Sequence, residues 1–304
     1  MENLVVHETP ELRDPPLLMA FGGWPDAGEA ATSAIKYLVR KLPAKKFAEL
    51  NPEEFYDFTQ TRPRTVLVAP GERMVHWPAN EFFYWRDTEA ERDMLLFVGV
   101  EPNLKWRTYA SLVTDLAARY GVKRVFHIGA LLDAVPHTRD IRLTGTSNSP
   151  QWRKTMEGMQ IVGSNYQGPT GITSAVWEAC TRRSMEYASV WGHTPHYLQA
   201  SPNYKVGYHL LRALRRILDA PLDLEELRHA SQTFQEEVEK VVAKDAQVQT
   251  YVRRLEEYYD QTFPKQAADM PSPGDVVKDL EEFLKELRRR RGDGGPPPQE
   301  PPKA

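Results

Sequence analysis

The sequence predicts an α/β fold in which helices cover both faces of a central sheet. Four short runs of branched and aromatic residues are typical of strands covered from both sides, and they occupy residues 17–21, 65–69, 94–100 and 125–132. Stretches with apolar residues at helical spacing lie between them, at residues 27–41 and 103–120. Strands that alternate with helices in this way indicate a layered α/β domain.

Further helices are expected toward the middle of the chain. The 103–120 stretch is followed by Gly121, which is a suitable residue to end a helix. Two more helical patterns follow, over residues 172–188 and 204–218. The second should end before Pro221, because proline cannot continue a helix. Residues 1–221 are therefore predicted to form one three-layer α/β/α domain.

The composition changes near residue 221, and strand signals almost disappear. Asp223 and Glu226 resemble a capping box that opens an amphipathic helix to residue 243. A partner helix is expected over 245–259, and a last helix after 274 that ends in the basic run 288–291. That run suits the helix dipole, although RNA contact is an alternative. We expect a helical region at 222–291 and a disordered proline-rich tail at 292–304.

Composition excludes several classes of function. The 304 residues carry 39 Lys and Arg against 42 Asp and Glu, so a net charge of -3 gives no field that collects nucleic acid or anionic lipid. The single cysteine, Cys180, cannot form an internal disulfide. We find no signal peptide and no apolar run of ~18 residues. These features predict a cytoplasmic protein with no nucleic-acid or membrane partner.

Two glycine-containing turns precede predicted helices. Residues 22–28 (GGWPDAG) contain Asp26, which suits the N-cap, although exposed amides there can also hold an anion. Residues 168–171 (GPTG) follow Tyr166 and can form either an amide nest for phosphate or carboxylate, or a rigid turn whose threonine caps the helix. In both turns we favour capping. Such turns converge at one edge of an open α/β sheet.

Histidine and arginine follow the strand at 125–132. His137 and Arg139 lie in the run PHTR, where they can serve as an acid/base and an oxyanion clamp, or pack the loop through hydrogen bonds. Glu101, in the run EPN, is the best candidate partner for either residue. His193 and His196 flank Pro195, so we expect a structural loop and no metal site. No nucleotide, cofactor or hydrolase signature is present, so no cofactor is expected.

All seven tryptophans precede residue 192, and basic residues do not interleave with them. We therefore expect core and interface anchors, with no role in stacking nucleic-acid bases. These residues are Trp24, Trp77, Trp85, Trp106, Trp152, Trp177 and Trp191.

Taken together, the motifs GWPDAG, EPN with Trp106, GALLDAVPHTR, YQGPTGI, PHY and SPN before a helix resemble the bacterial and archaeal members of the proteasome assembly chaperone 2 family. The resemblance covers roughly residues 4 to 240, and VPHTR combined with YQGPTGI is its most specific part. It implies an α/β/α sandwich related to phosphorylase and nucleoside-hydrolase-like folds, followed by C-terminal helices. It also implies a homo-oligomer, with a trimer as the first expectation.

The resemblance also suggests which residues bind a ligand or partner. Eukaryotic relatives are non-enzymatic chaperones of the proteasome α-ring, and an archaeal relative acts through a C-terminal hydrophobic-Tyr-any-residue tail. This sequence ends QEPPKA, without that tyrosine, so we do not expect docking through its terminus. The candidate residues for a pocket or partner surface are Trp24, Asp26, Glu101, Asn103, His137, Thr138, Arg139, Tyr166, Pro169, Thr170, Gly171, His196 and Tyr197.

We therefore expect a non-enzymatic assembly or scaffold protein that binds other proteins, among which proteasome subunits are candidates. The alternative is a small-molecule site for a nucleoside- or phosphate-like ligand, hydrolytic or phosphorylytic. That site would use Asp26, Glu101, His137, Arg139, Tyr166 and Thr170 at the strand ends.

Overall fold

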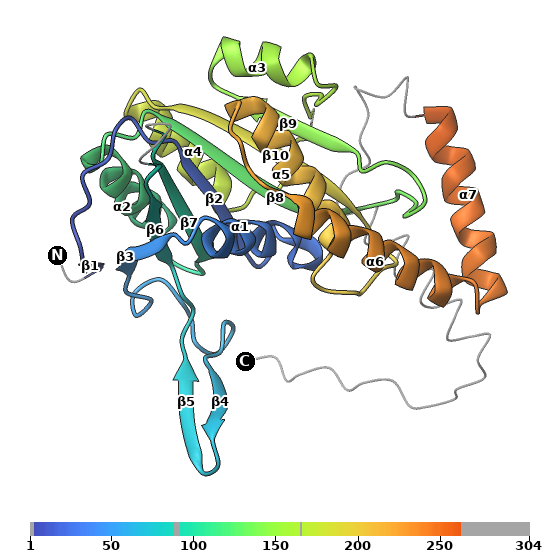
Figure 1. Cartoon of the computed structure of the whole chain (residues 1–304), viewed down its shortest axis with the longest axis horizontal. Coiled ribbons are helices and arrows are strands. Elements are labelled where there is room, and N and C mark those ends of the chain that lie inside the picture. Colours follow the sequence, from blue (N-terminus) through green and yellow to red (C-terminus); the bar gives the residue numbers. More distant parts are fainter. Residues whose placement is uncertain (1–2, 88–91, 165, 263–304) are drawn as a thin grey trace.

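A mixed eight-stranded sheet forms the centre of the molecule (Figure 1). The computed structural model describes residues 3–87, 92–164 and 166–262. Four neighbouring strands are parallel, so their carboxyl ends meet at one edge, and antiparallel strands flank them on both sides. In sheet order the strands are β1 (Leu4–Val6), β3 (Lys45–Leu50), β6 (Glu81–Trp85), β7 (Met94–Val100), β2 (Leu17–Gly22), β8 (Arg124–Asp133), β10 (Glu186–Pro195) and β9 (Leu143–Ser147).

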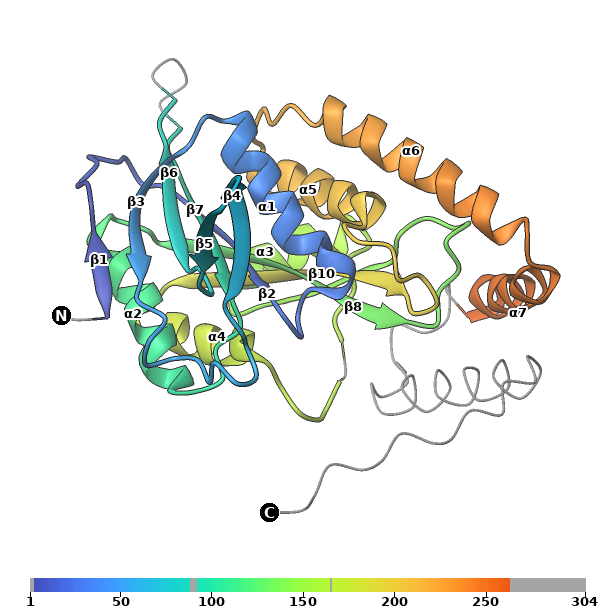
Figure 2. The same cartoon turned by 90° about the horizontal axis from the view of Figure 1, so that it is seen from below.

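Helices cover both faces of this sheet, which confirms the predicted three-layer α/β/α architecture (Figure 2). On one face, the short turn η1 (Ala27–Glu29) leads into α1 (Ala30–Lys41), which packs beside α5 (Tyr204–Leu218). The other face carries α2 (Trp106–Arg119) and α4 (Ile172–Arg182). Helix α3 (Pro150–Glu157) contacts β9 and α5. The boundaries of α1, α2 and α5 agree closely with the predicted stretches.

Strand β2 shows why its residues form a continuous apolar run. Leu18 and Ala20 belong to the buried cluster under α1 and α5, whereas Met19 and Phe21 belong to the cluster under α2 and α4. Alternate side chains of a strand point to opposite faces, and here both faces are covered. All residues of β2 before Gly22 are therefore apolar, and Gly22 is the first residue of the strand that is partly exposed.

One predicted strand lies elsewhere. Residues 65–69 were expected to be covered from both sides, but they form β4 (Arg64–Ala69), which pairs with β5 (Glu72–His76) in a separate hairpin. Figure 1 shows this hairpin, which we call the arm, projecting from the body. Every residue from 64 to 77 is exposed. The expectation that other parts of this chain cover residues 65–69 is therefore wrong. An apolar run indicates that a segment favours burial, but it does not identify the surface that buries it.

A second correction concerns residues 183–195. The helix predicted to reach residue 188 ends at Arg182, and β10 begins at Glu186. Ser184 has φ of 56° between them. Small and polar residues such as Gly192 and Thr194 interrupt the apolar pattern of β10, so the sequence did not indicate a strand. Strands β1, β3, β5, β6 and β9 and helix α3 were not predicted either.

The C-terminal helices extend along α5 and then turn away. Helix α6 (Glu225–Val242) packs on α5, and Leu222, Leu224 and Leu227 join the buried cluster of α1 and α5. Helix α7 (Ala246–Thr262) lies beyond the ends of β8 and β10 (Figure 2). The predicted last helix, the basic run 288–291 and the tail 292–304 lie outside the described residues. Within the described part, no helix combines the length and apolarity needed to cross a bilayer.

Candidate functional site

The predicted site residues lie near the carboxyl ends of the parallel strands, in two groups. The cap group follows β2 and β7 and includes the loop before α4, with Trp24, Asp26, Glu101, Asn103, Tyr166, Pro169, Thr170 and Gly171. The α7 group follows β8 and β10, with His137, Thr138, Arg139, His196 and Tyr197. The groups differ in what their charged side chains bind: carboxylates bind helix amides in the cap group, and Arg139 binds carboxylates of α7 in the other.

Asp26 binds the first turn of α1. Its Oδ1 accepts hydrogen bonds from the amides of Ala31 at 2.7 Å and Thr32 at 3.2 Å, and its Oδ2 accepts one from the Thr32 hydroxyl. These bonds satisfy amides that have no partner within the helix. Burial raises the pKa of Asp26, and the three hydrogen bonds oppose that rise. Asp26 therefore caps α1, as predicted, although the residue at the N-cap position of this helix is Glu29.

Glu101 has the same role at α4. Its Oε1 accepts from the amide of Ile172 at 2.8 Å, and the Trp24 amide also donates to it. Burial raises the pKa of Glu101. The expected pairing of Glu101 with Arg139 or His137 is wrong, because neither residue is among these partners. The expected capping by Thr170 is also wrong, since its hydroxyl bonds to the Ser174 hydroxyl and Glu101 takes the first amide.

Asn103 holds the segment that leads toward the arm. Its Oδ1 accepts from the amide of Asp57 and from the hydroxyl of Thr61, both at 3.0 Å. The Asn103 amide donates to the carbonyl of Phe55 at 2.9 Å. This side chain therefore has a structural role in ordering residues 55–61.

Apolar side chains occupy the outer surface of the cap group. Trp24 is exposed after β2, Leu104 after β7, Tyr166 before α4 and Trp177 on α4 itself. A Cβ added to Gly171 would lie 3.2 Å from the Trp24 ring and 2.8 Å from Glu101 Oε1, so the loop passes closely under the indole. Glycine at this position lets the loop approach both groups.

In the α7 group, Arg139 is bound to α7. Its Nη2 and Nε donate to the two carboxylate oxygens of Asp260 at 2.7 and 2.9 Å, and its Nη1 donates to Glu256 at 3.1 Å. The Thr138 hydroxyl also donates to Glu256. This two-point arrangement matches the fork of the guanidinium to a carboxylate. The charge of Arg139 therefore fastens α7 to the loop between β8 and β9.

His137 is buried and makes contacts within the same loop region. Its amide and its Nδ1 lie 2.7 and 2.6 Å from the Tyr197 hydroxyl. Lys205 Nζ donates to the carbonyls of His137 and Arg139 at 2.6 and 3.0 Å. Burial, with a smaller effect of the Lys205 charge, lowers the pKa of His137. Both effects favour the neutral imidazole, which suits a residue that packs the loop.

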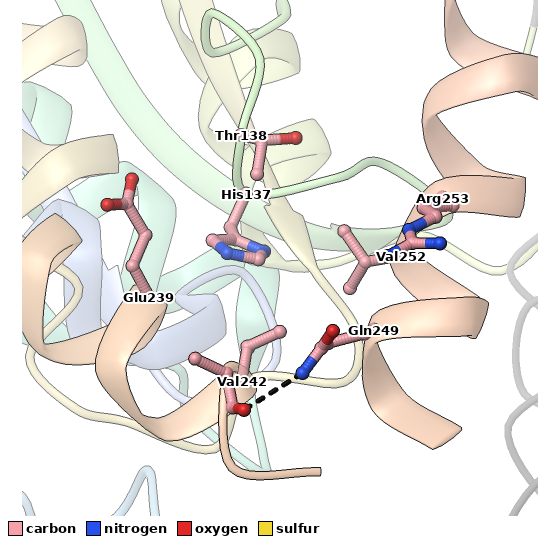
Figure 3. A pocket seen from close by; sticks show the side chains of 8 residues that line it. His137, Thr138, Glu239, Val242, Gln249, Val252 and Arg253 are labelled. Carbon is pink, nitrogen blue, oxygen red and sulfur yellow. Dashed lines mark hydrogen bonds between the residues drawn. The ribbon is translucent and has the colours of Figure 1, made fainter. Parts of the chain in front are cut away.

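A small cavity lies between this loop and the two C-terminal helices. Figure 3 shows His137 directed into it, between α6 and α7. Its volume is about 240 Å³, below the ~300–1,000 Å³ of most ligand pockets. The lining residues are His137, Thr138, Glu239, Val242, Ala243, Gln249, Val252 and Arg253.

The histidine pair 193 and 196 is not the loop that the sequence predicted. His193 lies within β10, and its Nδ1 is 2.6 Å from Asp133 Oδ2 while its Nε2 is 3.0 Å from Thr144 Oγ1. His196 binds elsewhere, through Nδ1 to the Asp133 carbonyl at 2.9 Å and through Nε2 to the Tyr251 hydroxyl at 2.7 Å. No group of three or more metal-binding side chains occurs in the described part of the chain.

Thr144, His193 and Asp133 have the connectivity of a hydroxyl–imidazole–carboxylate relay. Asp133 accepts from Nδ1, so Nε2 is free to accept from the threonine hydroxyl. All three side chains are buried, which keeps a substrate away from the Thr144 hydroxyl. The relay instead joins β8, β9 and β10. This relay was not predicted from the sequence, where its signal is a set of polar residues in strands that tertiary pairing aligns.

Known proteins resemble this chain in sequence and fold. A protein-family model described as PAC2 family matches residues 20–242 of this chain. A PAC2 family protein from Streptomyces avermitilis is 34% identical with a TM-score of 0.70, covering 79% of this chain and 100% of that one. The proteasome-assembly chaperone homologue Rv2125 from Mycobacterium tuberculosis is 31% identical, TM-score 0.70, with coverage of 78% and 99%. A search of curated proteins gives no match.

Another solved structure matches a larger share of the chain. The Mycobacterium tuberculosis protein of unknown function Rv2714 is 27% identical with a TM-score of 0.78. The match covers 87% of this chain and 93% of that one.

Proposed function

We propose, because the chain belongs to the PAC2 family, that it is a non-enzymatic, assembly-chaperone-like protein that binds other proteins through its strand-end surface. The similarity to the proteasome-assembly chaperone homologue Rv2125 makes proteasome subunits the first partners to test. We place this activity in the cytoplasm and expect the protein to act as a homo-oligomer.

The observation that carries the proposal is that the carboxylates of the cap group bind helix amides, while aromatic side chains around them are exposed. The carboxylates of Asp26 and Glu101 are directed at helix amides, while Trp24 and Trp177 are exposed around them. Exposed indoles are typical of binding hot spots between proteins. A catalytic site instead needs polar groups directed at the space that a substrate would occupy.

The alternative, a small-molecule site, has less support. Its six proposed residues are divided between the cap group and the α7 group, and Arg139 is bound by Asp260 and Glu256. The relay that could act on a carbonyl or phosphoryl group is buried. The cavity beside His137 is small, with a volume of about 240 Å³.

The test is titration of the purified protein with recombinant proteasome α subunits, followed by light scattering and calorimetry. We expect a complex whose dissociation constant rises about tenfold or more in Trp24→Ala, as for an aromatic anchor. Tyr258→Ala is the matched control, since this exposed aromatic on α7 lies outside the cap group. Circular dichroism checks that both variants fold.

Two outcomes would contradict the proposal. One is the absence of a complex with α subunits, or a complex that Trp24→Ala leaves unchanged. The other is stabilisation by nucleosides, nucleotides or phosphate, where a ligand at 100 times its dissociation constant adds ~2.7 kcal/mol. That second result would favour the small-molecule function.

A further inference from the structure

The cap group exposes four large apolar side chains on segments that touch one another. The Trp24 amide donates to Glu101, and Glu101 also accepts from the first amide of α4. The segments after β2 and β7 are thereby held to the start of α4. Apolar side chains that gather on a surface mark an interaction site, whereas isolated ones are common. In order of exposure the four are Trp24 (56%), Leu104 (49%), Trp177 (40%) and Tyr166 (37%).

The two indoles also have free hydrogen-bonding capacity. In the part of the chain that the structure describes, the ring N–H groups of Trp24 and Trp177 meet no acceptor. By contrast, Trp106 and Trp152 donate to a carbonyl and a carboxylate at 2.6 and 2.9 Å. Aromatic rings with N–H donors suit a polyproline II segment, because proline rings pack on the aromatic faces and the carbonyls of that helix have no internal partners.

The chain itself contains a segment of this kind. Residues 296–303 read PPPQEPPK and hold five of the 24 prolines. Proline fixes φ near about -65°, so such a run favours polyproline II before it binds and loses little conformational entropy on docking. Pro298 and Pro301 have the Pro-x-x-Pro spacing that aromatic grooves recognise.

Charge adds a second point of complementarity. Lys303 follows the two prolines, and Asp57 borders the aromatic surface, since its amide donates to Asn103, next to Leu104, at 3.0 Å. The amide and hydroxyl of Thr59 donate to the Asp57 carboxylate and lower its pKa. No cation pairs with this carboxylate among residues 3–87, 92–164 and 166–262. An ionised carboxylate is therefore available to the lysine.

The length of the chain allows the contact within one molecule. Helix α7 ends at Thr262, and residues 263–295 separate it from the proline segment. That separation spans on the order of 100 Å at full extension, whereas a domain of this size has a radius of gyration of about 18 Å. Tethering raises the local concentration of the segment toward the millimolar range. Even a modest affinity therefore gives high occupancy.

We propose that residues 296–303 dock as a polyproline II helix on the exposed aromatic surface of the cap group of the same chain, with Lys303 directed at Asp57. The segment then covers Trp24, so it competes with any protein that binds there. This competition rests on the proposed function, whereas the docking does not.

The test compares the full chain with a chain that ends at Gly295. The probe is an acetylated peptide of residues 295–304, titrated by calorimetry. We expect it to bind the shortened chain with a dissociation constant of about 0.1 mM or below. Binding to the full chain should be at least about tenfold weaker, because the tethered segment at ~1 mM occupies the surface. The truncation removes no described residue, and circular dichroism checks the fold.

Variants locate the contact on both sides. In the shortened chain, Trp24→Ala should raise the dissociation constant of the peptide at least about tenfold. Tyr258→Ala, which removes an exposed aromatic ring of α7, is the matched control and should leave it unchanged. A peptide with Pro298→Ala and Pro301→Ala should bind at least about tenfold more weakly, because its backbone is no longer fixed.

Zero-length carbodiimide cross-linking tests the orientation in the full chain. Mass spectrometry should find an amide between Lys303 and Asp57 within one chain, and Asp57→Asn should remove it. Cross-links from Lys303 only to carboxylates outside the cap group would overturn the proposal. It is also overturned if the peptide does not bind the shortened chain, binds the full chain equally well, or is unaffected by Trp24→Ala.

The competition has its own readout. The shortened chain should bind proteasome α subunits several-fold more tightly than the full chain, and equal binding would refute the competition. Absence of any complex with α subunits would instead contradict the proposed function. The peptide titration needs no such subunits, so failure of the docking and failure of the proposed function are told apart.

Discussion

Asp26 and Asp133 lie at the carboxyl ends of the neighbouring parallel strands β2 and β8, and they are equally buried, with 6% and 4% of their surface exposed. Their pKa values nevertheless shift in opposite directions. Burial raises the pKa of Asp26, whose partners are two amides and a hydroxyl. Burial also opposes ionisation of Asp133, but His193 and Arg142 hold its pKa below the ordinary value.

The difference shows what compensates a buried carboxylate. Neutral dipoles at a helix start reduce the cost of burying the charge of Asp26 without removing it. A guanidinium 3.7 Å from Asp133 and a hydrogen-bonded imidazole reverse the balance. Depth alone therefore does not set the direction of the shift. Three predictions test the comparison, in order of decreasing effect.

The largest effect is expected from Asp133→Ala. This change leaves Arg142 and His193 in a buried site without their carboxylate, so the free energy of unfolding should fall by about 3 kcal/mol. Denaturant unfolding measures the loss. Asp133→Asn keeps an acceptor for His193 and should lose less. A loss under about 1 kcal/mol in Asp133→Ala would show that Asp133 is not held as the structure indicates.

The second prediction concerns pH. Because the pKa of Asp26 is raised, its contribution to stability is complete below the unfolded value of ~3.9 and is lost as pH rises through the folded value. Because the pKa of Asp133 is lowered, its contribution is present above ~3.9 and is lost as pH falls through the folded value. The two aspartates therefore oppose each other across the acid range.

Unfolding measured from acid to neutral pH separates the two contributions. Asp26→Asn should remove part of the loss of stability on the neutral side of the ordinary aspartate pKa. Asp133→Asn should remove part of the loss on the acid side. Wild-type curves minus variant curves should thus have opposite slopes, and slopes of the same sign would contradict the comparison.

The smallest effect is expected at Arg139, where the paired charges are partly exposed to solvent. Arg139→Ala removes the contact with Asp260 and Glu256 that fastens α7, and exposed ion pairs add little to global stability. The unfolding midpoint should stay nearly constant, while amides of α7 exchange several-fold faster by local opening. Arg182→Ala, which breaks the exposed pair with Glu178, is the control and should leave α7 exchange unchanged. Unchanged exchange in Arg139→Ala would show that α7 is held mainly by Val252 and Leu255.

Several elements were predictable because local residues alone decide them. Strands β2, β7 and β8 are continuous apolar runs, since both faces of each are covered. Helices α1, α2 and α5 keep apolar residues on one side and end at residues that stop helices. Asp26 was predictable as a cap for the same reason, because the amides that it binds lie five and six residues away.

Other features depend on residues far apart in the chain. Glu101 and Ile172 are 71 residues apart, and Arg139 and Asp260 are 121 apart. No spacing rule relates such pairs, so the expected contact between Glu101 and Arg139 could not be tested from sequence. Likewise, the polar residues of β9 and β10 form a relay only because strand pairing aligns them.

The sequence by itself determined the three-layer architecture, the family and the helix-capping role of Asp26, because hydrophobic periodicity, motif order and cap residues act over short distances. Tertiary structure decided the partners of Glu101, Arg139 and His193, because charged groups pair by proximity in space. It also decided the fate of residues 65–69. Their sequence favours burial, and only the fold shows that no other part of the described chain covers them.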